Sequence, residues 1–130
     1  MKNYYEILGV SSQISNKKLR AKIIAIAEKC HPNAPSYNVE EPDEFIKAFI
    51  AFDVLLSSTN RLAIRRIQMA KDSGTPESEM VSELQILKAA EDNARLKSQS
   101  IAKMSIEDFK ELYNPNFLEN LFGFLFRLGR

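Results

Sequence analysis

The sequence contains one cysteine and one histidine, Cys30 and His31, and these two residues are adjacent. A lone cysteine cannot form a disulfide within the chain, and an unpaired thiol suits a reducing compartment. A structural zinc site takes about four ligands, and the chain offers no further Cys or His. Adjacent helical residues also point in different directions, which argues against a thiol with His31 as its base. We therefore expect no catalytic residue, no metal and no cofactor.

Glycine and proline are also scarce, at 4 and 5 of the 130 residues, which fits neither a disordered nor a turn-rich β chain. The net charge of +1 argues against bulk electrostatic binding, so we expect no nucleic-acid partner. No apolar run reaches the ~18 residues that a membrane-spanning helix needs. The N-terminal MKNYYEILGV lacks the apolar core of a signal peptide. The expectation is a helical, cytoplasmic protein that is not an enzyme.

Helical spacing of apolar residues predicts four helical segments in the first half of the chain. A short turn over residues 4–9 ends at a glycine in the C-cap position. Ser15 can cap a second helix that runs to about Cys30. Pro42 begins a third helix, and a fourth covers roughly residues 60–71.

The stretch KDSGTPESE marks a boundary between two parts of the chain. Pro76 suits the first position of a helix, and the apolar seam that follows predicts a helix over about 76–103. Ser105 begins another short helix. We therefore predict an N-terminal domain over 1–71 and a helical extension over 72–130.

Three features of the first half occur together: the opening YYEILGV, a helix that ends in His31-Pro32, and a third helix with Phe45, Phe52 and Leu55 on its core face. Over about residues 2–68 this pattern resembles the J-domain of DnaJ-type co-chaperones. The resemblance implies an all-α, four-helix arrangement. Its second and third helices would be antiparallel, with the His-Pro loop at their tip. Cys30 stands where the family buries an aromatic side chain, so burial is expected for it.

In that family a His-Pro-Asp loop and basic residues of the second helix dock on a DnaK-type chaperone and stimulate its ATP hydrolysis. The resemblance implies a function as co-chaperone or chaperone-linked adaptor with a DnaK-type partner. Carried over position by position, the chaperone-docking residues are His31, Pro32, Asn33, Arg20, Lys29 and Lys22.

The sequence departs from the family pattern at two places on this surface. Asn33 replaces the aspartate of the loop, and Ile24 and Ala25 stand where the second helix is normally basic. Charge-assisted hydrogen bonds are about twice as strong as neutral ones. Breaking one side of a desolvated charge pair costs about 2–5 kcal/mol, which is more than tenfold in affinity. We therefore expect weakened stimulation of the chaperone ATPase.

A second group of apolar residues suggests another kind of surface. Ile46, Phe49 and Ile50 occupy positions of the third helix that are usually polar in the family, and Ile24 extends this apolar area. Residues 76–130 can fold back over these side chains. Otherwise Ile24, Ile46 and Ile50 form an interface for another subunit or client, since exposed apolar patches mark such sites.

The C-terminal stretch FLENLFGFLFRLGR carries an apolar stripe at helical spacing: Leu118, Leu121, Phe122 and Leu125. This predicted helix can pack on the first domain, bind a second copy or a client, or lie on a membrane surface. The alternative to a co-chaperone is thus a degenerate J-like structural or assembly module. Such a module would bind another protein or a membrane surface through its apolar patch and C-terminal helix.

Overall fold

A computed structural model describes residues 3–37 and 43–116, and within them the chain forms six α-helices, one 3₁₀ turn and no strands. The helices are α1 (Tyr4–Leu8), α2 (Asn16–Cys30), α3 (Glu44–Leu55), α4 (Ser58–Asp72), α5 (Val81–Lys103) and α6 (Ile106–Leu112), with the 3₁₀ turn η1 at Glu77–Glu79. The expected all-α fold is confirmed over these residues.

Three helix ends have the caps that the sequence predicts. Gly9 ends α1 in the left-handed region, with φ of +66°, which favours glycine. The side chain of Ser15 accepts a hydrogen bond from the backbone N–H of Lys18 at the start of α2. Ser105 caps α6 in the same way, by accepting from the N–H of Asp108.

Two predicted helix starts were wrong. The helix α4 begins at Ser58, two residues before the predicted start, because the side chain of Ser57 accepts a hydrogen bond from the N–H of Asn60. The helix α5 begins at Val81 instead of about residue 76. Pro76 has an extended backbone and leads into the 3₁₀ turn η1, so the α-helical hydrogen bonds begin only after that turn. Pro42, the predicted start of α3, lies outside the described residues.

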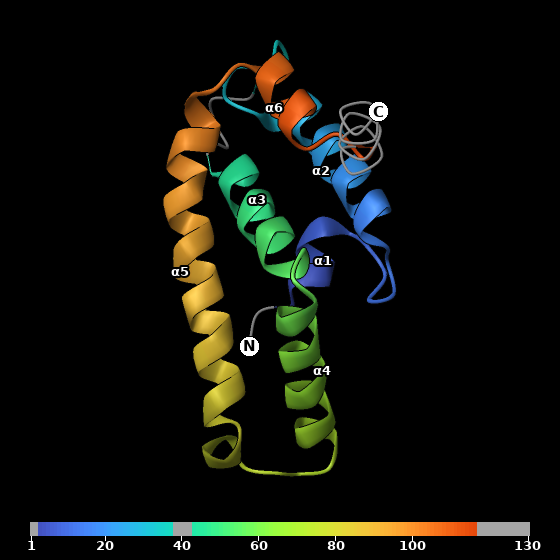
Figure 1. Ribbon diagram of the computed structural model, residues 1–130, viewed down its shortest axis with the longest axis vertical. Coiled ribbons are helices and arrows are strands. Elements are labelled where there is room, and N and C mark those ends of the chain that lie inside the picture. Colours follow the sequence, from blue (N-terminus) through green and yellow to red (C-terminus); the bar gives the residue numbers. More distant parts are fainter. Residues whose placement is uncertain (1–2, 38–42, 117–130) are drawn as a thin grey trace, which may run out of the picture.

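The helices surround α3, which is buried on most of its sides. Figure 1 shows α2 and α3 running in opposite directions, with α1 at one end of the pair and the long α5 beside α3 and α4. Because α1, α2, α4 and α5 all contact α3, eight of its twelve residues are buried. An all-round apolar helix is typical of a core position.

The extension shares its core with the first four helices. Leu87 and Ile101 of α5 and Phe109 of α6 belong to the same buried cluster as Phe45 and Leu55 of α3. The expectation that residues after 76 fold back over α3 is confirmed for α5 and α6. The division of the chain at residue 71 stays a prediction.

Candidate functional site

His31 lies at the tip of the α2–α3 pair, where α2 ends and the His-Pro-Asn loop begins. Its backbone N–H closes the last turn of α2 by bonding to the carbonyl of Ala27, and its side chain is fully buried. The ring Nδ1 accepts the backbone N–H of Asn33 at 3.0 Å, and Nε2 lies 3.0 Å from the carbonyl oxygen of Ile101. With Nδ1 as an acceptor, Nε2 must carry the proton and donate it to Ile101, which selects one neutral tautomer.

Asn33 connects the same loop to the junction between α5 and α6. Its side-chain amide donates a hydrogen bond of 2.8 Å to the carbonyl of Met104. An ionised aspartate is only an acceptor, so it cannot make this bond and would place its charge against a carbonyl oxygen. Asn33 therefore supplies the donor at this contact that an aspartate would lack.

Aromatic side chains surround the imidazole of His31. The ring of Phe45 meets it at a centroid distance of 4.7 Å, and that of Phe109 at 5.6 Å. Phe109 is fully buried and lies 5.4 Å from Phe45, edge to face. Tyr113 follows at 4.9 Å from Phe109. This packing links the loop, α3 and α6 into one cluster whose rings adopt the tilted and edge-to-face arrangements that aromatic pairs prefer.

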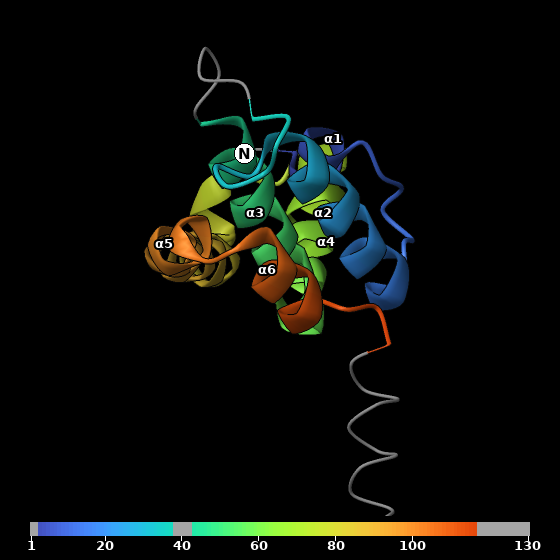
Figure 2. The same ribbon diagram turned by 90° about the horizontal axis from the view of Figure 1, so that it is seen from above.

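The helix α6 lies along one face of α2, as Figure 2 shows from above. Near the end of α2, Lys110 forms an ion pair of 2.9 Å with Glu28. Two turns earlier, the guanidinium of Arg20 lies over the ring of Tyr113, 5.9 Å from its centroid. Ile24 is on the same helical face, one turn from each of these residues. The α2 face that carries Arg20 and Ile24 is thus occupied by α6 and the residue that follows it.

The predicted chaperone-docking residues do not all lie on this face. Lys22 lies on another side of α2, at a shallow hollow that it shares with Glu6 and Glu44. Lys29 is exposed and Pro32 is half-buried. The structure places the buried His31 and the exposed Asn33 in contact with the extension and leaves Lys22 and Lys29 outside that contact.

The predicted apolar interface is largely used inside the molecule. Ile50 is 7% exposed, while Ile24 and Ile46 are partly buried and pack against the core cluster. The four apolar residues of the predicted C-terminal helix lie outside the described residues: Leu118, Leu121, Phe122 and Leu125. The roles of all these residues in binding stay predictions.

Sequence reasoning did not identify the residues that contact the loop, Ile101, Met104 and Phe109, or Tyr113, which packs on Phe109. Ile101 and Met104 act through backbone carbonyls, which any residue type supplies, so no sequence pattern marks them. Phe109 and Tyr113 are four residues apart in the helix that Ser105 begins, and this spacing places them on one face. That apolar pair was the available signal that α6 has a buried side.

Cys30 is inert in this arrangement. The thiol is buried and donates to the carbonyl of Ile26. Burial, with a smaller contribution from the charge of Glu44, raises the pKa of Cys30 to about 11, and only the thiolate is a nucleophile or a metal ligand. No group of three metal-binding side chains occurs within residues 3–37 and 43–116. Over the same residues, no helix combines the length and the apolar character needed to cross a membrane.

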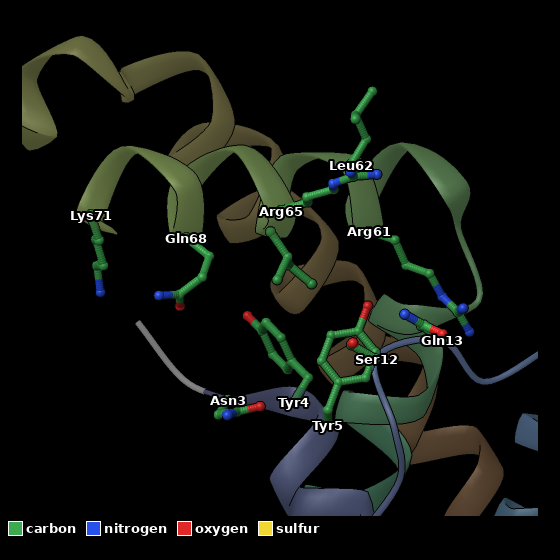
Figure 3. A pocket seen from close by; sticks show the side chains of 11 residues that line it. Asn3, Tyr4, Tyr5, Ser12, Gln13, Arg61, Leu62, Arg65, Gln68 and Lys71 are labelled. Carbon is green, nitrogen blue, oxygen red and sulfur yellow. The ribbon is translucent and has the colours of Figure 1, made fainter. Parts of the chain in front are cut away.

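A separate hollow of about 830 Å³ opens between α1 and α4. In Figure 3 the rings of Tyr4 and Tyr5 reach toward α4, from which Arg65, Gln68 and Lys71 project. Among the described residues that line the hollow there is no carboxylate. None of the residues predicted from the sequence to bind a partner lies in it.

Comparison with known proteins supports the resemblance. The chaperone protein DnaJ of Psychrobacter arcticus is 36% identical over 66 residues, which are 51% of this chain and 18% of that protein. About half of this chain is J-domain-like. The matched stretch spans less than a fifth of the relative's length. No family model matches the chain, and no solved structure matches it.

Proposed function

We propose that this protein is a chaperone-linked adaptor that docks a DnaK-type chaperone through α2 and the His-Pro-Asn loop and stimulates its ATP hydrolysis weakly. The similarity to a DnaJ protein supports the class of partner. The basic side chains of α2 and the retained His31-Pro32 pair support the docking surface. The adaptor needs no catalytic chemistry of its own.

The hydrogen bond from Asn33 to Met104 carries the proposal of weak stimulation. Position 33 has no negative charge, and its amide is already engaged within the chain. The fully buried ring of His31 adds to this, because a partner cannot contact it while the extension is in place. Both observations reduce the number of polar groups of the loop that can contact a chaperone.

Single-turnover ATP hydrolysis by a DnaK-type chaperone tests this function. We expect a small but saturable rate increase with the wild-type protein. The increase should disappear with Lys29→Glu, which reverses an exposed charge of the docking set. Lys88→Glu is the matched control, because Lys88 is also exposed and pairs with Asp92 on the surface of α5. No rate increase and no binding by the wild-type protein would contradict the proposal.

The burial of His31 also favours a second candidate function, a J-like assembly module. In this alternative the loop serves only to anchor the extension, and partners bind through Ile24, Ile46 and the C-terminal residues 117–130. Light scattering coupled to gel filtration of the full chain separates the two. A stable dimer that does not bind the chaperone would favour the assembly module, whereas a monomer that binds it would favour the adaptor.

A further inference from the structure

The two departures from the J-domain pattern have the same neighbour in space. Asn33, in place of aspartate, donates to the carbonyl of Met104. Ile24, in place of a basic residue, lies between two α2 positions that α6 and its following residue contact, Arg20 and Glu28. Residues 104–113 therefore contact Asn33 directly and contact α2 on both sides of Ile24, whereas Ala25, the other apolar residue at the basic positions, stays exposed. We call this segment, which comprises α6 and its flanking residues, the cover.

The helices α2 and α6 have net charges of opposite sign and are joined by an ion pair. The helix α2 has five basic side chains and one acidic one, Glu28, while α6 has three acidic side chains and one basic one, Lys110. The two residues of minority charge pair with each other at 2.9 Å. The remaining charges of the two helices are opposite in sign, but Lys22 and Lys29 lie outside the contact, so the charge contact on which the cover relies is the Lys110–Glu28 pair.

We propose that the cover is an internal ligand of the docking surface and competes with the DnaK-type chaperone for α2 and the His-Pro-Asn loop. This inference rests on the proposed function. The chaperone binds only the open form, in which α6 has left α2. Its apparent affinity is then reduced by the fraction of molecules that are open.

The contacts at the rim of the cover differ from those at its centre. Phe109 and His31 are fully buried, so opening exposes them and the closed form predominates in the free protein. The contacts of Lys110 with Glu28 and of Asn33 with Met104 are exposed to solvent. A partner that binds α2 can displace these outer contacts first.

A double variant, Lys110→Glu with Tyr113→Ser, weakens the cover and keeps Phe109, His31 and every docking residue. It places a carboxylate beside Glu28 and removes the ring under Arg20. We expect the full-length variant to bind an ATP-bound DnaK-type chaperone about tenfold more tightly than the wild type. That factor corresponds to about 1.4 kcal/mol. Fluorescence anisotropy measures the affinity, and Lys88→Glu on α5 is the control that should leave it unchanged.

Hydrogen exchange of the free proteins reports the opening without any chaperone. We expect faster exchange in the double variant at the amide of Asn33, which bonds to His31, and along α6. Thermal unfolding verifies that the variant is folded at the temperature of the assay. Faster exchange together with tighter binding supports the competition.

Two results would overturn the proposed competition between the cover and the chaperone while leaving the proposed function in place. The first is a hydrogen-exchange rate in the double variant equal to that of the wild type, because the rim contacts would then not hold the cover on α2. The second is faster exchange with an affinity equal to that of the wild type, because the cover would then not compete. Absence of binding by both proteins has a different meaning. It would reject the proposed function, and the competition with it, although exchange would still measure the opening.

Discussion

The two ends of this helical protein differ in how their surfaces are used. At the tip of the α2–α3 pair, where the resemblance to J-domains places the docking loop, His31 is fully buried and Asn33 bonds to the extension. At the opposite end, α1 and α4 leave a hollow of about 830 Å³ with exposed basic side chains such as Arg65 and Lys71. At the expected docking loop the ring of His31 is closed off while Asn33 and Lys29 stay exposed, and the hollow at the other end is open although no role was expected for it.

The difference shows that the residues which pack over the loop come from outside the stretch that resembles a J-domain. A J-domain-like sequence places the loop at a helix tip, but it does not decide what lies over that tip. Here the cover supplies the ring of Phe109 for His31 and the carbonyl of Met104 for Asn33. Both side chains thus have hydrogen-bond partners inside the chain, which the buried imidazole of His31 requires.

The largest expected effect comes from removing the anchor of the closed end. Phe109→Ala should lower the free energy of unfolding by about 3–5 kcal/mol, the usual cost of deleting a fully buried phenylalanine. Leu112→Ala is the matched control on α6, because Leu112 is 45% exposed, and should cost about 1 kcal/mol or less. Chemical denaturation measures both. Equal costs for the two variants would show that α6 is not anchored through Phe109.

The stability of the protein should also depend on pH through the side chain of Tyr113 at the closed end. Burial and the charge of Asp53 raise the pKa of Tyr113 to about 12 from its usual 10, against a lowering by Arg20. Between pH 10 and 12 the unfolded chain has lost this proton and the folded one keeps it, so stability falls as the pH rises. Because the ring is partly exposed, we expect a loss of about 1–2 kcal/mol.

Tyr113→Phe is the control for this titration, since it keeps the ring and removes the ionisable group. Tyr4, Tyr5 and Cys30 also have raised pKa values, so the variant should reduce the slope above pH 10 without abolishing it. The difference between the wild type and the variant in the slope of unfolding free energy against pH measures the contribution of Tyr113. An unchanged slope would mean that this phenol titrates as it does in water.

Asn33→Asp tests the link between the loop and the cover. The change should cost about 1 kcal/mol of stability, because it removes one hydrogen bond and turns a carboxylate toward the carbonyl of Met104. Asn93→Asp, at an exposed position of α5, controls for the added charge. Urea unfolding at neutral pH gives both values. A stability equal to that of the wild type would show that the bond to Met104 contributes nothing.

The smallest effect is expected at the open end. Arg65→Glu should change the stability by less than about 0.5 kcal/mol, as is usual for exposed substitutions away from a core or a network. Arg61→Ala, one turn earlier on α4, is the contrasting variant. The Arg61 guanidinium donates to the carbonyls of Leu55 and Ile14. If Arg65→Glu proved as costly as Arg61→Ala, the hollow would not be the open surface that the structure shows.

Much of the local structure follows from short stretches of sequence. Gly9 ends α1, and Ser15 and Ser105 begin α2 and α6, because each cap depends only on neighbours within a few residues. The apolar periodicity likewise identified the core side chains of α3. Where the prediction missed, at Ser57 and Pro76, more than one nearby residue was able to start the helix.

The sequence alone thus determined an all-helical chain, most of its helix ends, and the loop that carries His31 and Asn33. Only the tertiary structure decided what those two residues contact, since their partners Ile101 and Met104 lie about 70 positions away and act through backbone carbonyls. A helical pattern records that one face is apolar, but it does not say which element will cover that face. That choice depends on how all six helices of the described chain pack together, and it placed the extension over the loop.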